Sequence, residues 1–476
     1  MKRLATAALA LSLCAAGAGA ETSVQLPDIG DPASAVLTPA QERALGSALL
    51  AQIRNQLRLV KDPELTSYVQ SLGARLVTNG VSGQTRFSFL LIDDSRINAF
   101  AAPGGIVAIN AGLLLTAQSE SELAAVLAHE IAHVTQRHLA RTYAKSGKIN
   151  VTTALGVLAA VLAGAYGGGD LGRAALYSSL AAGAQAQLAF SRTNEIEADS
   201  VGIRLLAAAG YEPRGMPQFL QRLHKNTQLN YGSIPEYLST HPVTLSRIAD
   251  TRARAAQFSG KFKSDSLTFR FAKARMRALT SNPASVVTDY ERALRTSRLP
   301  PVTMRYTYAI AQSLAGYQDK ALEVLEELQA QEEGSLPINL ALAQAQIKAG
   351  RSEQATVLLE RMNAIYPGQE SIIYHLADAL IMRGRAAKAL RLLDSKTRNG
   401  AHNPELDKLK ATAAARTNKP WLSHESTADY YMAYGQYAAA LEQFDLAIEG
   451  EDVDHVTRAR VSSKRKQLKE LTEGRR

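Results

Sequence analysis

The chain is almost devoid of thiols: it has one cysteine in 476 residues. Cys14 lies in the apolar stretch at the N-terminus, so a chain cleaved after Ala20 holds no cysteine at all. That absence excludes disulfide bonds and thiol catalysis in the mature protein. An exported chain of this length does not need disulfides, because its core can bury enough apolar surface without them.

Two kinds of binding motif are also missing. No Gly-rich loop precedes a Lys-Ser or Lys-Thr pair, and no basic run is interleaved with aromatic residues. We therefore expect neither nucleotides nor nucleic acid as partners. The formal net charge of +10 instead favours acidic proteins or anionic lipid surfaces through long-range attraction.

The N-terminus has the pattern of a secretory signal. Two basic residues precede an apolar run over residues 4–16, and the small residues 18–20 resemble a cleavage site. We predict a signal peptide over residues 1–20 and a periplasmic location in a bacterial envelope. Lipid attachment at Cys14 is the alternative; Leu13 disfavours it, because a lipoprotein signal has a small residue there.

The pentapeptide HEIAH, residues 129–133, has the spacing of a zinc site. His129 and His133 are four residues apart and share one face of a helix, so both can bind one metal ion. Glu130 lies beside that face and can take a proton from a metal-bound water. A capping box at residues 119–122 precedes the apolar run, which places the motif on a helix. The pattern predicts one Zn²⁺ per chain.

A zinc ion held by two histidines needs a third ligand. Residues 191–199, SRTNEIEAD, offer Glu195 and Asp199 on one helical face, whereas Glu197 points away. We expect Glu195 to bind the metal and Asp199 to act in the catalytic group by orienting a ligand histidine. A solvated acidic face is the alternative. His138 does not fit the longer zinc motif and is predicted to lie on the surface.

A later segment bears on the fourth position of the metal. His241-Pro242 and Arg247 lie where a loop leads into a helix. Either His241 or Arg247 could stabilise the oxyanion of a tetrahedral intermediate. A neutral His241 could instead be the fourth ligand and block the enzyme, or the segment could be a plain helix start. The sequence leaves these alternatives open.

Two short strands are predicted at residues 86–91 and 106–109. Pro and paired Gly interrupt the run between them, which is typical of a sheet edge. Such an edge beside the zinc helix could pair with an extended substrate, although an ordinary hairpin is equally compatible with the pattern. The predicted edge residues are Asn98, Ala99, Phe100, Pro103 and Gly104.

Helical periodicity predicts two further helices, at residues 38–57 and 63–76, which we expect to pack on the zinc helix. Residues 149–166 are nearly all apolar. We favour a buried helix, a lid over the cleft or a peripheral membrane contact for them, with a transmembrane span as the alternative.

The C-terminal half carries a repeat. Gly316, Gly350 and Gly384 are 34 residues apart, and an Ala follows each one five residues later. A fourth copy at Gly435 lies 51 residues further on, which leaves room for one extra helix. Thirty-four residues is the tetratricopeptide period, and such arrays stack into solenoids that bind peptides or partner proteins. A purely scaffolding solenoid is the alternative. The basic tail after His455 is predicted to be a solvated helix, with a contact to acidic partners or lipid as the alternative.

HEIAH, the Glu195 to Asp199 spacing, NAFAAPGG and the His241-Pro242 to Arg247 segment, in this order, resemble metallopeptidase family forty-eight. The resemblance implies zinc at His129, His133 and Glu195, with Glu130 as the catalytic base. An exported member with repeats is most similar to those family members that assist the assembly of outer-membrane β-barrel proteins and degrade stalled ones.

We therefore expect a signal peptide (1–20), a mainly α, zincin-like α+β metallopeptidase domain with a small β-sheet (21–265) and an all-α tetratricopeptide solenoid (266–476). The predicted function is a periplasmic zinc metalloendopeptidase with chaperone-like action. Its expected partners are unfolded or partly assembled envelope proteins and, through the repeats, the outer-membrane assembly machinery. Two alternatives remain: an adaptor with a latent protease site, and a membrane-embedded quality-control protease.

Overall fold

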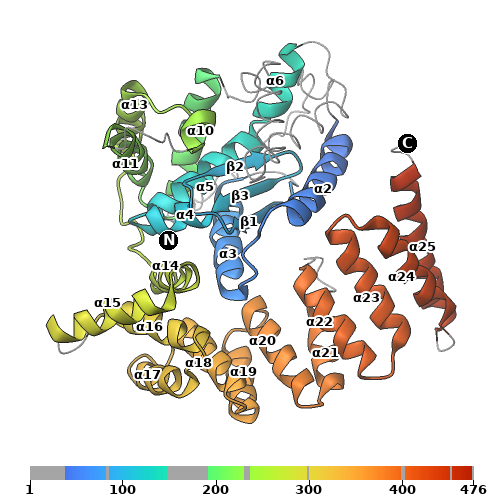
Figure 1. Cartoon of the computed structure of the whole chain (residues 1–476). Coiled ribbons are helices and arrows are strands. Elements are labelled where there is room, and N and C mark those ends of the chain that lie inside the picture. Colours follow the sequence, from blue (N-terminus) through green and yellow to red (C-terminus); the bar gives the residue numbers. More distant parts are fainter. Residues whose placement is uncertain are drawn as a thin grey trace, which may run out of the picture.

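A computed structural model describes most of the chain (Figure 1). The described residues are 38–81, 85–146, 191–229, 236–296, 300–397, 403–450 and 453–473. The predicted signal peptide, Cys14 and the apolar segment 149–166 lie outside these ranges. Within them, no helix is both long and apolar enough to cross a membrane.

The N-terminal half combines helices with one small sheet. Its elements are α2 (Pro39–Gln56), α3 (Pro63–Gly80), β1 (Ser88–Ile92), β2 (Ala99–Ala102), β3 (Ile106–Asn110), α4 (Ala111–Thr116), α5 (Glu120–Thr135), α6 (His138–Ser146), α10 (Arg192–Ala208), α11 (Gly215–Leu229), α12 (Glu236–Thr240) and α13 (Leu245–Ala255). The predicted mainly α fold with a small sheet is confirmed.

The sheet has the order β1-β3-β2, with β1 parallel and β2 antiparallel to β3. Because successive side chains of a strand point to opposite faces, the sheet separates two layers of helices. Phe89, Leu91, Val107 and Ile109 face the core that contains α3 and α5. Leu90, Ile92, Ile106 and Ala108 face α2. The strand β2 forms one edge, beside α5 (Figure 1).

The helices at residues 38–57 and 63–76 were both predicted to pack on the helix that carries HEIAH, and this is confirmed for only one of them. The helix α3 packs on α5 as expected, but α2 lies mainly on the other face of the sheet. The periodicity of α2 reveals that one of its faces is apolar, but not which face of a sheet that stripe will cover.

The helix α5 lies at the centre of the N-terminal half. Its N-cap is Ser119, whose hydroxyl accepts a hydrogen bond from the backbone of Glu122 at 3.2 Å. Every residue from Glu120 to His133 is buried. The helix α10 packs along it, which brings the HEIAH segment beside the acidic segment predicted to complete the site.

The C-terminal half is a curved array of helical hairpins (Figure 1). Its elements are α14 (Leu267–Thr280), α15 (Pro283–Thr296), α16 (Val302–Leu314), α17 (Gln318–Gln331), α18 (Leu336–Lys348), α19 (Ser352–Ile365), α20 (Glu370–Met382), α21 (Ala386–Thr397), α22 (Pro404–Ala415), α23 (Pro420–Ala433), α24 (Tyr437–Glu449) and α25 (His455–Glu473).

The repeat glycines lie in the turns between paired helices. Gly316, Gly350, Gly384 and Gly435 all have a positive φ, between 69° and 89°, which a side chain would disfavour. The Ala that follows each of them by five residues is fully buried, so the helices can approach closely. The extra helix predicted between the third and fourth copies is α22.

The basic C-terminal segment was expected to be a solvated helix, and this is wrong for one face of α25. Val461 and Leu468 are buried. Lys464 pairs with Asp429 at 2.8 Å, and Arg460 pairs with Glu425. The positive charges of α25 are therefore partly used to attach it to α23, a partner that charge counting could not reveal.

Candidate metal centre

Four buried side chains point their donor atoms at one spot. His129 and His133 come from α5, and Glu195 comes from the first turn of α10. His241 directly follows α12. One donor atom from each lies within 4.8 Å of all the others. The spacing of four residues on a helix brings the two α5 histidines together, with 3.0 Å between their Nε2 atoms.

The distances among these atoms allow a test of whether a metal fits. A tetrahedral zinc ion with ligand bonds of 2.0–2.1 Å would hold its donor atoms about 3.3 Å apart. His241 Nδ1 lies 3.3 Å from His129 Nε2 and 3.0 Å from a Glu195 oxygen. His133 Nε2 lies 3.4 Å from the same oxygen. Three imidazole nitrogens and a carboxylate at these separations fit Zn²⁺ in both chemistry and size.

Glu130 lies next to this group and is fully buried. Among the described residues, neither of its carboxylate oxygens has a hydrogen-bond partner, although His241 Nε2 lies 3.5 Å from one of them. Burial raises the pKa of Glu130. A buried carboxyl without a hydrogen-bond donor is costly, so it needs a water or a ligand at the position towards which it points.

Asp199 and Arg247 contact the candidate ligands His129 and Glu195 and orient them. Asp199 accepts from the Arg247 guanidinium at 2.6 Å and 2.9 Å, and lies 2.9 Å from Nδ1 of His129. The remaining guanidinium nitrogen lies 2.6 Å from Glu195. Arg247 therefore orients the two carboxylates that contact His129, and it also donates to the Pro242 carbonyl at 3.0 Å.

The pKa shifts of the candidate ligands show how burial and neighbouring charges set their protonation states. Burial disfavours protonation of His129, but Asp199 and Glu195 outweigh it and raise its pKa to about 9. Burial lowers the pKa of His133 well below its usual range, which keeps that imidazole neutral. Burial alone would raise the pKa of Glu195, yet His241 and His129 hold it well below its usual range. A neutral imidazole and an ionised carboxylate are the forms that bind metals, and His133 and Glu195 are in those forms. A metal would have to displace the proton of His129, whose pKa is raised.

Residues 63–255, which contain all of these side chains, match the model of peptidase family M48. The beta-barrel assembly-enhancing protease of Yersinia pestis is 37% identical over 327 residues, 67% of each chain. The chain belongs to peptidase family M48. It is accordingly a metalloendopeptidase, and the resemblance drawn from its motifs is confirmed.

Other relatives and a second family model extend this picture. A putative beta-barrel assembly-enhancing protease of Vibrio cholerae is 43% identical over 54% of this chain and 52% of its own. A mitochondrial metalloendopeptidase of Schizosaccharomyces pombe is 32% identical over 38% of this chain and 51% of its own. Residues 318–367 and 349–413 match the tetratricopeptide repeat, which confirms the repeat predicted from the spaced glycines.

One residue of this M48 peptidase was misjudged from the sequence. His138 was predicted to lie on the surface, but it is fully buried. Its Nδ1 lies 2.9 Å from Nδ1 of His133, and its Nε2 lies 3.2 Å from Glu197. It holds the ring of a candidate ligand, an arrangement that the spacing of a longer zinc motif does not describe. The sequence signal that could have indicated this contact is the spacing of five residues between His133 and His138, with a helix break between them.

Tyr237 also supports a candidate ligand, and no motif in the sequence indicated it. The ring of Tyr237 stacks on His241, with 4.7 Å between their centroids. Tyr237 is 2% exposed and lies one turn before His241. It therefore fixes the orientation of the imidazole that completes the ligand group.

The predicted edge residues surround β2. Ala99 and Phe100 lie in the strand, Asn98 precedes it, and Pro103 and Gly104 form the turn into β3. The strand is thus one arm of a hairpin and also the edge of the sheet, and its pairing with a substrate stays a prediction. A small cavity beside His133 is lined by Ala101, Ala102 and Pro103.

Proposed function

We propose that this M48 peptidase is a periplasmic zinc endopeptidase that acts on misfolded or assembling outer-membrane β-barrel proteins. The observation that carries the proposal is the group of four buried ligand atoms with the buried carboxyl of Glu130 beside it. We assign His129, His133 and Glu195 as the ligands of one Zn²⁺. When bound there, zinc would acidify a water and polarise the scissile carbonyl.

The protein side chains have separate roles in this proposal. Glu130 accepts the proton of the attacking water and later donates it to the leaving amine. Burial raises the pKa of Glu130, which makes it a stronger base than an exposed carboxylate. Asp199 holds the His129 ring through Nδ1, and Arg247 holds Asp199.

The edge strand gives a means of binding polypeptides of varied sequence. A substrate segment added to β2 would form main-chain hydrogen bonds, which do not depend on side chains. Only an extended, locally unfolded segment can pair in this way. The strand lies beside α5, so such a segment would pass the ligand group.

The substrate class and location draw on the relatives and the N-terminal sequence. Two of the similar proteins carry names that refer to β-barrel assembly. The signal pattern over residues 1–20 supports export to the periplasm, where barrels are unfolded in transit. The repeats supply a surface for partner proteins, among which we place the outer-membrane assembly machinery.

The test is the variant Glu130→Gln in the full mature chain. We expect it to retain one equivalent of zinc and to lose cleavage of an unfolded β-barrel protein by at least about 100-fold. Glu353→Gln, at an exposed position of α19, is the matched control and should cleave at the wild-type rate. Cleavage that survives in Glu130→Gln would contradict the assignment of the base.

A second function is favoured by one specific observation. His241 Nδ1 occupies the place of a fourth ligand, and a closed four-ligand site is typical of structural rather than catalytic zinc. The protease would then be latent, and the chain would act mainly as a chaperone or adaptor. His241→Ala should raise cleavage if the imidazole blocks the site. An unchanged or lower rate would show that His241 assists catalysis instead.

A further inference from the structure

The first helix of the repeat array, α14, belongs to two hydrophobic cores at once. Phe269, Ala272 and Met276 pack in the core of the peptidase half. Phe271, Ala274 and Ala278 pack in the core of the repeats with Tyr306. A helix that is buried on two faces cannot serve as a hinge. The sequence boundary at residue 265 therefore does not mark a flexible joint.

The N-termini of α14 and of the metal-binding helix α5 exchange carboxylates. Asp265, just before α14, accepts the backbone N–H of Glu120, the first residue of α5, at 2.7 Å. The Glu120 carboxylate in turn accepts the backbone N–H and the hydroxyl of Ser266, both at 3.0 Å. Each helix start thus receives a negative charge from the other, which favours both helix dipoles.

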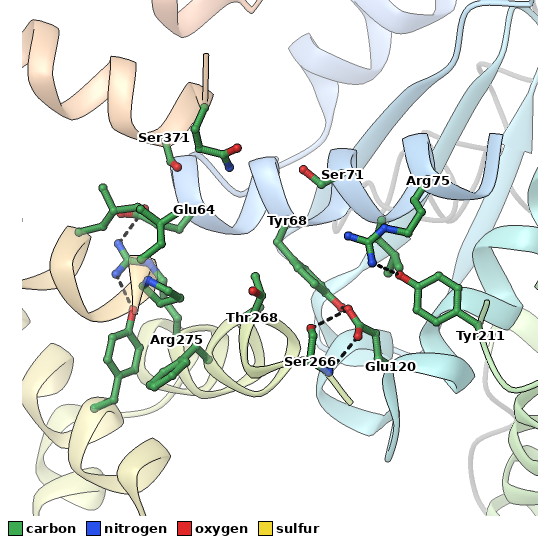
Figure 2. A pocket seen from close by; sticks show the side chains of 18 residues that line it. Glu64, Tyr68, Ser71, Arg75, Glu120, Tyr211, Ser266, Thr268, Arg275 and Ser371 are labelled. Atoms are coloured by element: carbon green, nitrogen blue, oxygen red, sulfur yellow. Dashed lines mark hydrogen bonds and ion pairs between the residues drawn. The ribbon is translucent and has the colours of Figure 1, made fainter. Parts of the chain in front are cut away.

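Other bonds strengthen this junction. Tyr68 of α3 donates to the Glu120 carboxylate at 3.2 Å, so three helices meet at that side chain (Figure 2). Glu120 is 5% exposed, and hydrogen bonds to a buried carboxylate are stronger than those in water.

Apolar packing is incomplete at the same place. A cavity of about 260 Å³ lies between α3 and α14, with Glu120, Ser266 and Arg275 among its lining residues (Figure 2). Close-packed side chains would resist relative displacement, whereas a cavity leaves room for it. The polar links from Glu120 and Asp265 supply a direct connection between α14 and α5 beside this cavity.

We propose that Asp265 and Glu120 are positioning residues that couple the repeat array to the metal-binding helix. A displacement of the repeats, such as a bound partner would cause, is passed through α14 to the start of α5. The ligand His129 lies nine residues further along, about 14 Å on a helix. Since α5 is buried along its length, it moves as a rigid element and carries His129 and His133 with it. This inference rests on the assignment of these histidines as metal ligands.

The experiment uses the full mature chain with Asp265→Asn, which preserves size and removes the charge. We expect kcat on an unfolded β-barrel protein to fall about fivefold, with KM within about twofold and zinc retained. The absorption bands of the cobalt-substituted enzyme should shift, because they report ligand geometry. In metal-free protein, the amides of residues 123–133 should exchange with solvent about fivefold faster.

The conservative variant and a matched control separate positioning from general damage. Asp265→Glu keeps the charge and should recover most of the lost kcat. Asp289→Asn, at an exposed position of α15, should behave as wild type in every measurement. If Asp265→Asn does not fold, Ser266→Ala removes one bond to Glu120 and should give the same changes at smaller size.

Unchanged kcat, cobalt spectrum and exchange rates in folded Asp265→Asn would overturn the coupling. A different result would contradict the proposed function, namely wild-type protein that binds no zinc or cleaves no substrate. The exchange measurement on metal-free protein still decides the coupling in that case.

Discussion

Arg275 is a buried cation at the junction between α14 and the peptidase half, and its removal should be among the most damaging single changes in the repeats. Its guanidinium donates to both oxygens of Asp62, at 2.7 to 2.9 Å, and lies 3.2 Å from Glu64. It also donates to Gln344 at 2.9 Å. Its side chain is 5% exposed. Burial opposes its charge, yet Glu64 and Asp62 raise the pKa of Arg275 well above its usual range.

The expected magnitude follows from what Arg275→Met leaves behind. Two carboxylates that are 11% and 10% exposed would lose their shared cation, and breaking a buried ion pair in this way costs about 3 to 5 kcal/mol. Replacing the whole group is expected to cost much less, because no charge is then left unpaired. The triple variant with Asp62→Asn and Glu64→Gln should therefore recover most of the loss.

The measurement is equilibrium urea unfolding of the full chain at pH 7, followed by far-UV circular dichroism. The pH dependence gives an independent check. Burial would raise the pKa of Glu64, but Arg275 and His375 lower it to about 2. Its stabilising contribution is complete above the unfolded pKa of about 4.3 and is lost as pH falls towards 2. A loss below about 1 kcal/mol at pH 7 in Arg275→Met would refute the reasoning.

Three further predictions concern stability and metal. Burial raises the pKa of Asp407 to about 7, so its ionisation opposes folding as pH rises from about 4 to 7. Asp407→Asn should match wild type at pH 4 and be up to about 4 kcal/mol more stable at pH 8, measured by urea unfolding. At Gly112 a Cβ would lie 2.0 Å from the Ser95 carbonyl oxygen, so Gly112→Ala should cost about 2 kcal/mol in the same assay, whereas Gly334→Ala, with open space around it, should not. His133→Ala should lose zinc as measured by elemental analysis, and removal of zinc by a chelator should abolish cleavage until zinc is restored.

Local periodicity made part of the site predictable. The four-residue spacing in HEIAH and in the Glu195 to Asp199 segment places side chains on one face of a helix, whatever surrounds that helix. The structure brings these residues together as expected, with Asp199 behind His129. The roles of His241 and Arg247 were left open by the sequence. Both depend on how the segment from α12 to α13 packs against the acidic segment, 46 to 48 residues away along the chain.

The errors came from the same limit. His138 was assigned to the surface because it does not fit the longer zinc motif, and α25 because it is basic. Neither pattern reveals a partner elsewhere in the chain. The helix α2 was expected to pack its apolar face on α5, but that face packs on the sheet instead.

The sequence by itself determined the helix that carries HEIAH, the acidic helix and the 34-residue repeat, since each depends on residues within a few turns of one another. The tertiary structure alone decided that His241 joins the candidate ligand atoms and that Arg247 contacts both carboxylates. It also decided that α14 is shared between two cores and attached to α5 through Asp265 and Glu120. These contacts join segments 40 to 150 residues apart, and only the packing of whole helices brings such segments within hydrogen-bond distance.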